Sequence, residues 1–293
     1  MANQHFGNIA DVWKHLWLAG VVADQRPSRY VETHAGSALY GLVEDEERAL
    51  GVMRFLAAAE SCAPLRDTAY WDLLQQFVLA EPPSYPGSSL LAMTILGPSS
   101  RYVFCDTDRG SVEDLLTARD RLALGSEVEV VHADGPEIAL ELLDAGTLGP
   151  GSFVHVDPFD YDAASPGGLS ILQLLNRLAA RQVPVFAWYH LSARELFREI
   201  ASNLPVPAVA CAELWLSGPR AASAGVGGSG CGIALIGDDF DRHPSVKEAA
   251  EDFVVAFNHL SSGLKAGVTA VSEFFMLPPT DRSARPVGIR PCG

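Results

Sequence analysis

Residues 29–37 read RYVETHAGS, and this stretch decides the fold that we expect. Its first half, Arg29–Thr33, combines aromatic and β-branched residues, which predicts a strand of the core. The small residues that follow it, from Ala35 to Ser37, predict a tight turn at which the backbone can approach a ligand closely. On both sides of this stretch, short apolar runs alternate with amphipathic segments along the chain.

Six further runs are short, apolar and bounded by Gly, Pro or Ser, and we expect them to be strands: Arg101–Asp106, Glu127–His132, Ser152–Asp157, Val183–Tyr189, Ala208–Leu216 and Cys231–Gly237. The helical spacing of apolar residues between them predicts helices over Ala10–Ala23, Ser111–Leu122, Pro136–Asp144, Gly168–Ala180, Ala193–Ser202 and Ser245–Leu260. This alternation predicts an α/β fold with a Rossmann-like, mostly parallel sheet of about seven strands and helices on both faces.

One interval breaks the alternation. The chain between the first strand and Arg101 is far longer than a single crossover requires, and both Glu44–Ala59 and Tyr70–Leu79 have helical patterns. We therefore expect four parts along the chain. They are an N-terminal helix with the first strand over 1–41, a small helical insertion over 42–84, the remainder of the same domain over 85–277, and a flexible tail over 278–293.

Composition argues against several classes of protein. The 293 residues carry a formal net charge of -15 and only three lysines, so the overall field repels a polyanion. Five scattered cysteines form neither a metal-ligand spacing nor a disulfide pattern, which is typical of a reducing compartment. No segment has the pattern of a signal peptide or of a membrane-spanning helix. We expect a cytoplasmic protein with no membrane partner and no bound metal.

Polar groups follow four consecutive strands. The first strand runs into His34, the second ends at Asp106, the third leads to Asp134-Gly135, and the fourth ends at Asp157-Pro158. Ligands of open parallel sheets collect outside the carboxyl ends of the strands. At that edge one carboxylate can accept hydrogen bonds from ribose hydroxyls, and another can accept a hydrogen bond from an adenine amino group. This arrangement suits S-adenosyl-L-methionine (SAM). Any one of these acids alone is equally typical of a turn or a helix cap.

The ordered series of motifs resembles one known family. Residues 5–15 (HFGNIADVWKH), 30–36 (YVETHAG) and 85–88 (YPGS), together with Asp134-Gly135 and Asp157-Pro158, are similar to motifs of the RlmJ family, the bacterial large-subunit ribosomal RNA adenine-N6 methyltransferases. The resemblance extends from about His5 to about Gly237. It implies a class I SAM-dependent methyltransferase fold and amino-directed methyl transfer.

The resemblance also implies roles for individual residues. It implies cofactor-binding roles for Lys14, His15, His34, Ala35, Gly36, Ser88, Asp106, Asp134, Gly135 and Asp157, and catalytic roles for Asp157, Pro158 and Phe159. In such a site a carboxylate accepts the hydrogens of the acceptor amine while the positive sulfonium is held in line. This chemistry requires no metal.

Departures from the family concern the acceptor. The family's DPPY motif is Asp157-Pro158-Phe159-Asp160 here, and its N-terminal tail, with a tyrosine and a basic residue, has no counterpart among the four residues before His5. With the acidic composition, this favours a small-molecule acceptor over ribosomal RNA. We expect the acceptor to contact residues after the fourth strand and at the end of the fifth: Asp160, Tyr161, Trp188, Tyr189 and His190.

Other hypotheses remain open. Methylation of an adenine in RNA would require an arginine surface built from Arg194, Arg198, Arg220 and the segment 282–290. A SAM enzyme without an external acceptor could cyclise the cofactor's own side chain and release methylthioadenosine. A homologue that has lost catalysis is the fourth hypothesis. Among other residues, Glu213 is either paired or directed into the site, and His155 is expected to be a hydrogen-bonded core histidine.

Overall fold

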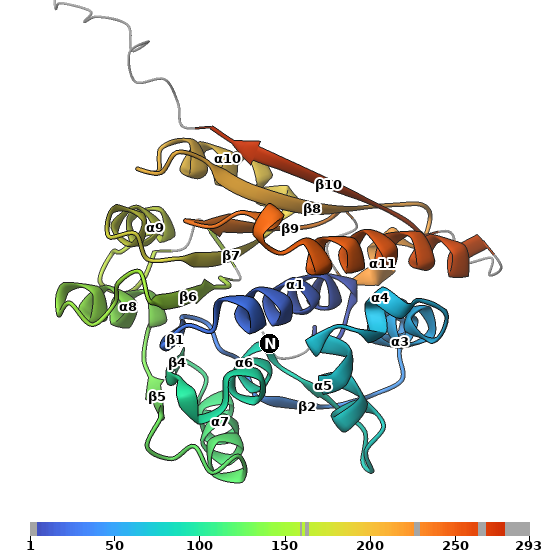
Figure 1. The fold of residues 1–293 in the computed structure, drawn as a ribbon, viewed down its shortest axis with the longest axis horizontal. Coiled ribbons are helices and arrows are strands. Elements are labelled where there is room, and N and C mark those ends of the chain that lie inside the picture. The colour runs from blue at the N-terminus through green and yellow to red at the C-terminus, as the bar shows by residue number, and fades with distance from the viewer. Residues whose placement is uncertain (1–4, 159, 162–163, 226–228, 263–267, 279–293) are drawn as a thin grey trace, which may run out of the picture.

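The computed structural model describes residues 5–158, 160–161, 164–225, 229–262 and 268–278. Within this part of the chain, eight strands form one sheet in the order β10-β8-β9-β7-β6-β1-β4-β5 (Figure 1). The strands are β1 (Arg29–Glu32), β4 (Arg101–Asp106), β5 (Val128–His132), β6 (Ser152–Val156), β7 (Val185–His190), β8 (Val209–Ser217), β9 (Gly230–Ile236) and β10 (Thr269–Leu277). Strand β1 lies in the middle, between β6 and β4.

The five strands from β5 to β7 are parallel, and β9, β8 and β10 continue the sheet with antiparallel pairing. The predicted α/β fold with a mostly parallel sheet is therefore confirmed. The expected number of about seven strands was one too low, because β10 adds an edge strand next to β8. Its sequence, TAVSEFFML, is rich in the β-branched and aromatic residues that favour strands, and that signal was missed.

Helices cover both faces of the sheet (Figure 1). One face packs against α1 (Ile9–Gln25), α6 (Ser88–Leu96), α7 (Arg109–Arg121) and α11 (Pro244–Ser262), and the other against α8 (Gly135–Asp144), α9 (Ile171–Ala180) and α10 (Arg194–Ser202). Because successive side chains of a strand point to opposite faces, each strand contributes to both cores. In β1, Tyr30 belongs to the α1 side and Val31 to the other side.

Helix α6 was not predicted. Its residues Leu90, Leu91, Ala92 and Met93 are all buried, so the sequence has no polar face that would reveal a helical period. The helix packs against α1, α5 (Ala69–Val78) and α7. A helix with few polar residues is the expected consequence of such burial.

The segment between β1 and α6 contains α2 (Glu46–Leu50), α3 (Val52–Ser61), α4 (Ala63–Arg66) and α5, and a small hairpin of β2 (Leu39–Gly41) with β3 (Ser84–Pro86) joins its two ends. One helix was predicted over Glu44–Ala59, but the chain breaks at Gly51. A Cβ atom there would lie 2.1 Å from the carbonyl oxygen of Gly7, so only glycine allows this approach. Whether 42–84 is a separate unit stays a prediction.

Two further expectations concern the ends and the membrane. The predicted tail 278–293 lies outside the described residues apart from its first residue. Among the helices that the structure describes, none is both long and apolar enough to cross a membrane.

Candidate functional site

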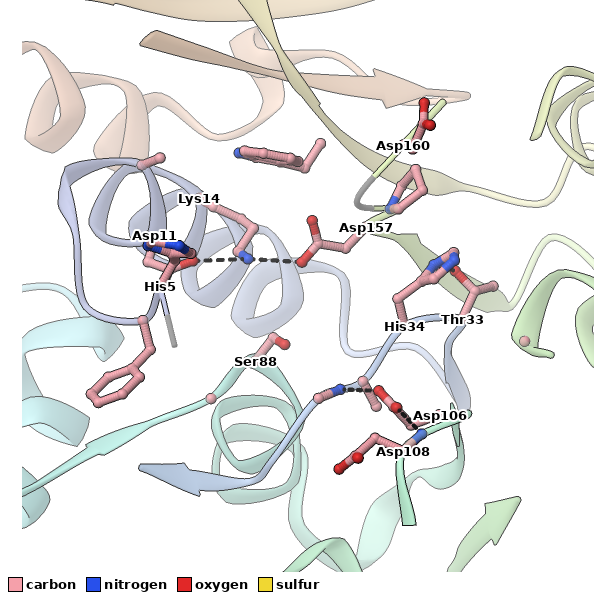
Figure 2. A pocket seen from close by; sticks show the side chains of 18 of the residues that line it. His5, Asp11, Lys14, Thr33, His34, Ser88, Asp106, Asp108, Asp157 and Asp160 are labelled. Carbon is pink, nitrogen blue, oxygen red and sulfur yellow. Dashed lines mark hydrogen bonds and ion pairs between the residues drawn. The ribbon is translucent and has the colours of Figure 1, made fainter. Parts of the chain in front are cut away.

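A cleft of about 1090 Å³ lies at the carboxyl ends of the parallel strands, facing the N-terminal half of α1 (Figure 2). Most of the predicted site residues line it: Lys14, His15, His34, Ala35, Gly36, Ser88, Asp106, Asp134, Gly135, Asp157, Pro158, Asp160, Trp188 and His190. The fold thus brings together residues that are far apart in the sequence. What each of them binds stays a prediction.

Two predicted acceptor residues do not line this cleft. Tyr189 points to the opposite face of the sheet, where its hydroxyl donates to the buried Glu213 at 2.9 Å and its ring stacks on Phe197. Its neighbour Trp188 faces the cleft, so the prediction for Tyr189 ignored the alternation of side chains along a strand. Tyr161 is buried against Phe197 and borders only a smaller side pocket. Phe159 lies outside the described residues.

The turn after β1 is held against the end of β4. Gly36 has a φ of +59°, a left-handed conformation that favours glycine, and its N–H donates to Asp106 Oδ2 at 2.8 Å. The amide of Ala35 donates to the carbonyl of Cys105 at 2.9 Å. These bonds keep the backbone of the turn at the wall of the cleft.

Asp106 also accepts the N–H of Asp108 through Oδ1 at 2.7 Å. Each oxygen of its carboxylate therefore accepts one backbone hydrogen bond, whereas an ionised carboxylate offers about two acceptor positions per oxygen. Asp108, which was not predicted, borders the cleft and caps α7 through Ser111 (Figure 2). The end of β4 thus presents a carboxylate that is fixed by the backbone and keeps acceptor capacity.

Asp134 is the N-cap of α8, and its Oδ1 accepts the N–H of Glu137 at 3.1 Å. The ordinary interpretation of an Asp-Gly pair as a helix start is therefore correct, although Asp134 also lines the cleft. Gly135 is required by packing, since a Cβ atom there would lie 1.9 Å from the carbonyl oxygen of Thr33. The start of α8 consequently sits directly against the end of β1.

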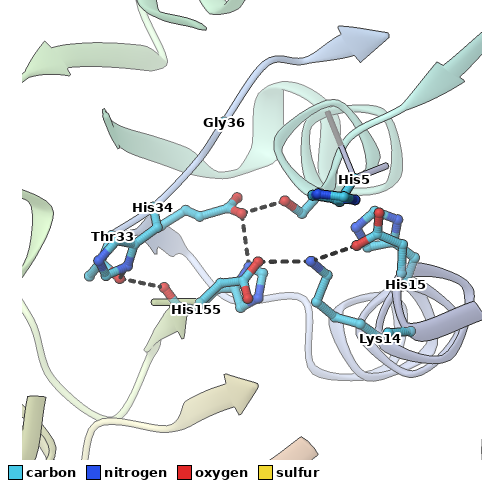
Figure 3. A network of polar contacts seen from close by, with 12 residues as sticks. His5, Lys14, His15, Thr33, His34, Gly36 and His155 are labelled. Carbon is cyan, nitrogen blue, oxygen red and sulfur yellow. Dashed lines mark hydrogen bonds and ion pairs between the residues drawn. The ribbon is translucent and has the colours of Figure 1, made fainter. Parts of the chain in front are cut away.

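A buried trio of charges crosses the cleft between α1 and β6 (Figures 2 and 3). Lys14 Nζ lies 2.8 Å from Asp157 Oδ2 and 3.1 Å from Asp11 Oδ1. Asp11 is held in turn by the N–H of Gly7 at 2.9 Å. The sequence motif contained Asp11, but no role was predicted for it, because the partner of its neighbour Lys14 comes from a distant strand.

The trio fixes the charge of Asp157. Burial alone would raise the pKa of this carboxyl group, but the Lys14 ammonium, with help from His155 and His34, holds the pKa below its usual value. Burial tends to lower the pKa of Lys14, and the two carboxylates raise it well above the usual range. The pair therefore stays ionised at neutral pH, and Asp157 reaches the cleft as a carboxylate.

A second polar network lies beneath the cleft (Figure 3). Glu32 is fully buried, accepts a hydrogen bond from Ser88 Oγ, and has its Oε1 atom 2.9 Å from His155 Nδ1. His155 Nε2 has no hydrogen-bond partner among the described residues, so the expectation of a fully hydrogen-bonded core histidine is wrong for this atom. Glu32 was not predicted, since an acid inside a short strand gives no signal of which face it occupies.

Burial lowers the pKa values of two cleft histidines, His15 and His34, which favours their neutral forms. Burial lowers the pKa of His15 well below its usual value, and the Lys14 charge lowers it further. His15 Nδ1 forms a hydrogen bond of 2.8 Å with the hydroxyl of Tyr85. Burial also lowers the pKa of His34, against the opposing influence of Asp157, Asp134 and Asp106. Neutral imidazoles can accept or donate a hydrogen bond.

Glu213 is paired on the face of the sheet opposite the cleft, where Arg194 Nε contacts both of its oxygens at 2.8 Å. The alternative that it points into the site is excluded by this geometry. Among the residues that the structure describes, no group of three or more His, Cys, Asp or Glu side chains is arranged to hold a metal ion.

Comparisons with known proteins identify the fold. No protein-family model matches the chain, and no curated protein matches its sequence. Protein LPL1258 from Legionella pneumophila, a DUF519 protein, has a similar structure, with a TM-score of 0.70 and 22% identity over 94% of this chain and 99% of its own. At that identity the likeness shows the fold alone.

Looser likenesses include proteins that bind a cofactor. They include cofactor-bound Rv0187 from MTB (TM-score 0.43, 15% identity, 81% of this chain and 85% of its own) and a SAM-dependent methyltransferase from Agrobacterium tumefaciens (TM-score 0.42, 11% identity, 76% and 60%). TM-scores this low carry no weight for function.

Counted along the chain within the large sheet, the strands from β5 to β8 have the order 3-2-1-4-5-7-6, with the seventh antiparallel. This is the arrangement of the Rossmann-like methyltransferase fold, so the predicted fold class is confirmed. The resemblance to the ribosomal RNA adenine methyltransferases stays a prediction.

Proposed function

We propose that the chain is a SAM-dependent methyltransferase that modifies an amine of a small-molecule acceptor. The observation that carries this proposal is the convergence of Asp106, Asp134 and Asp157, from the ends of three parallel strands, in one cleft. Such a crevice at the carboxyl edge of the sheet is where ligands of this class of fold bind. Its volume of about 1090 Å³ is at the upper end of the range for small-molecule sites, which suits a cofactor and an acceptor together.

The residues present fit the cofactor. Gly36 places no side chain at its own position in the cleft wall, and Asp106 keeps acceptor capacity for ribose hydroxyls. Asp134 lies at the next strand end, where it can accept from the adenine amino group. SAM bound there would supply an electrophilic methyl group. The protein's part is to hold both reactants in line and to exclude water.

Asp157 is the residue that we assign to the acceptor. It is ionised because of Lys14, so it can accept a hydrogen from the acceptor nitrogen and orient the lone pair of that nitrogen. Because Lys14 donates to Oδ2, the carboxylate group is fixed in one orientation before any ligand binds. The Pro158 that follows restricts the backbone at the same position.

RNA as the acceptor would require an exposed arginine surface. Three of the arginines that such a surface would need lie against carboxylates: Arg194 against Glu213, Arg198 against Glu195, and Arg220 against Glu46. A phosphate backbone would have to compete with these partners. This favours a small acceptor.

The experiment that tests the proposal is incubation of the purified protein with SAM, with calorimetry of binding and mass analysis of the adenosine-containing products. We expect SAM to bind and to remain intact until an amine is added. Release of methylthioadenosine without an acceptor would show that the protein catalyses intramolecular alkylation of SAM and not methyl transfer. Absence of SAM binding would refute the proposal.

A further inference from the structure

A smaller pocket of about 240 Å³ opens beside the cleft. Four residues line both spaces: Pro158, Asp160, Trp188 and His190. The side pocket is thus continuous with the cleft at the point next to Asp157. Its volume is below the usual range for drug-sized ligands, so it fits a small molecule or one small end of a larger one. Tyr161 and Leu196 form its apolar wall.

His190 is the polar side chain at this junction. It lies at the end of β7, and its ring packs edge-on against Trp188 with a centroid distance of 4.6 Å, which orients the imidazole. Its ring nitrogens have no hydrogen-bond partner among the described residues, although Ser192 borders the same pocket. A partly buried imidazole without a partner, on the wall of a pocket, is available to a ligand.

The charged groups that face His190 are carboxylates. Asp157 approaches from the end of β6 as a carboxylate, Asp160 lines the pocket from the following loop, and Cys231 is its register partner on β9. Burial raises the pKa of the Cys231 thiol above its usual value, so this group stays neutral. Lys14 lies near Trp188, but its ammonium is already paired with the carboxylates of Asp11 and Asp157.

The carboxylates beside the side pocket indicate the class of ligand. No described residue that lines the side pocket is a lysine or an arginine, while Asp160 contributes a carboxylate. Burial lowers the pKa of His190, only partly opposed by Asp157, so the imidazole is unprotonated at neutral pH. A pocket lined by a carboxylate and an unprotonated imidazole selects small cations that carry a removable proton.

We propose that the side pocket binds the acceptor as a small protonated aliphatic amine and that His190 removes its proton before methyl transfer. This inference rests on the proposed function and adds the substrate class and the base. The imidazole takes a proton from the ammonium, which leaves a neutral amine. The nitrogen lone pair then forms the bond to the methyl carbon as the carbon–sulfur bond breaks and its electron pair stays on sulfur. The methylated ammonium and the thioether leave, and the imidazolium returns its proton to solvent.

Binding can be tested without SAM and without turnover. The full chain, labelled with ¹⁵N-histidine, is titrated with ethylamine, 2-phenylethylamine and histamine, and with ethanol, 2-phenylethanol and 3-phenylpropionate as neutral and anionic analogues. We expect at least one amine to bind at least about tenfold more tightly than its alcohol and to shift the His190 resonances. If no amine shifts them, or if the alcohols bind as well as the amines, the inference is wrong.

Turnover gives the second test, with His190→Gln and the control His132→Gln, which changes an exposed histidine outside the cleft lining. At pH 7 we expect the first variant to lose about 100-fold or more in kcat/KM for the amine. The loss should shrink as the pH approaches the pKa of the amine, because solvent then removes the proton. A deficit of constant size at every pH would indicate a structural role and overturn the assignment.

The two proposals fail in different ways. If SAM does not bind, the proposed function fails, while the amine titration still reports on the pocket. If SAM binds and amines leave His190 unaffected, the methyltransferase proposal stands and this inference is rejected.

Discussion

The ammonium of Lys14 on α1 and the carboxylate of Asp157 at the end of β6 form a buried ion pair at 2.8 Å. The two side chains are 9% and 16% exposed, so little water screens their attraction. The pair joins the N-terminal helix to the carboxyl edge of the sheet, at the centre of the proposed site. It therefore connects the stability of the fold with the charge state of the residue that we assign to the acceptor.

Replacing Lys14 by Met should destabilise the protein strongly. The change leaves Asp11 and Asp157 buried without their cation, and removal of one partner of a buried pair typically costs about 3–5 kcal/mol. Without Lys14 the pKa of Asp157 should rise. Urea denaturation measures the first effect.

The matched control for this change is Lys247→Met. Lys247 pairs with Asp241 at the surface, with side chains 31% and 78% exposed, and such a pair typically contributes less than about 1 kcal/mol. If both variants lose the same free energy of unfolding, the buried Lys14 pair stabilises the protein no more than a surface pair does.

Replacing Asp157 by Asn or by Ala should abolish turnover and change SAM affinity by no more than about tenfold, because we assign its role to the acceptor. Single-turnover assays and calorimetry measure the two quantities separately. Since both changes also remove a partner of Lys14, thermal unfolding must show that the variants are folded. A large loss of SAM affinity in a folded variant would move Asp157 from the acceptor to the cofactor.

Replacing Gly135 by Ala should disturb the meeting of α8 with β1. The added methyl group would lie 1.9 Å from the carbonyl oxygen of Thr33, and such overpacking typically costs about 1–3 kcal/mol or more. Gly125→Ala and Gly149→Ala are the controls, since no atom lies within 4 Å of their added methyl groups. If denaturant midpoints are the same for all three variants, the close packing at Gly135 is not rigid.

We expect the free energy of unfolding to depend on pH through the protonation of His243. Burial tends to lower the pKa of His243, but hydrogen bonds to Asp238 at 2.8 Å and Asp24 at 2.7 Å raise it above its usual value. Because the pKa of His243 is higher in the folded protein than in the unfolded chain, protonation of His243 stabilises the fold. This stabilisation is fully present below the unfolded-state pKa of 6.5 and is lost as the pH rises through the pKa of the folded protein. His243→Gln should therefore cost more at pH 5.5 than at pH 8.5, on the order of 1–3 kcal/mol at the lower pH. Equal costs at both values in urea titrations would contradict this.

Sequence patterns predicted the elements whose two faces differ. The parallel strands and the helices between them showed clear periods, and each site acid after β4, β5 and β6 followed from its place at a strand end. Helix α6 was not predicted because most of its residues are buried, and the break at Gly51 was not predicted because its cause, the carbonyl of Gly7, lies outside the helix. Local patterns carry no information about such distant contacts.

The same limit applies to the site. The resemblance implied that Lys14 and Asp157 share a pocket, but their ion pair depends on the way α1 crosses the sheet, which no spacing reveals. Tyr189 was placed in the site with its neighbours Trp188 and His190, although the alternation of a strand assigns it to the other face. Residues that are adjacent along a strand occupy opposite faces of the sheet.

The distance along the chain between Lys14 and Asp157 also has a consequence for synthesis. The two residues are 143 positions apart, so at about 5–20 residues per second the ribosome completes Asp157 roughly 7–30 s after Lys14. During that time the nascent helix carries an ammonium whose later partner does not yet exist, and β1 lacks its neighbour β6. The cleft can therefore assemble only after more than half of the polypeptide has been translated, and a nascent chain interrupted before Asp157 cannot form it.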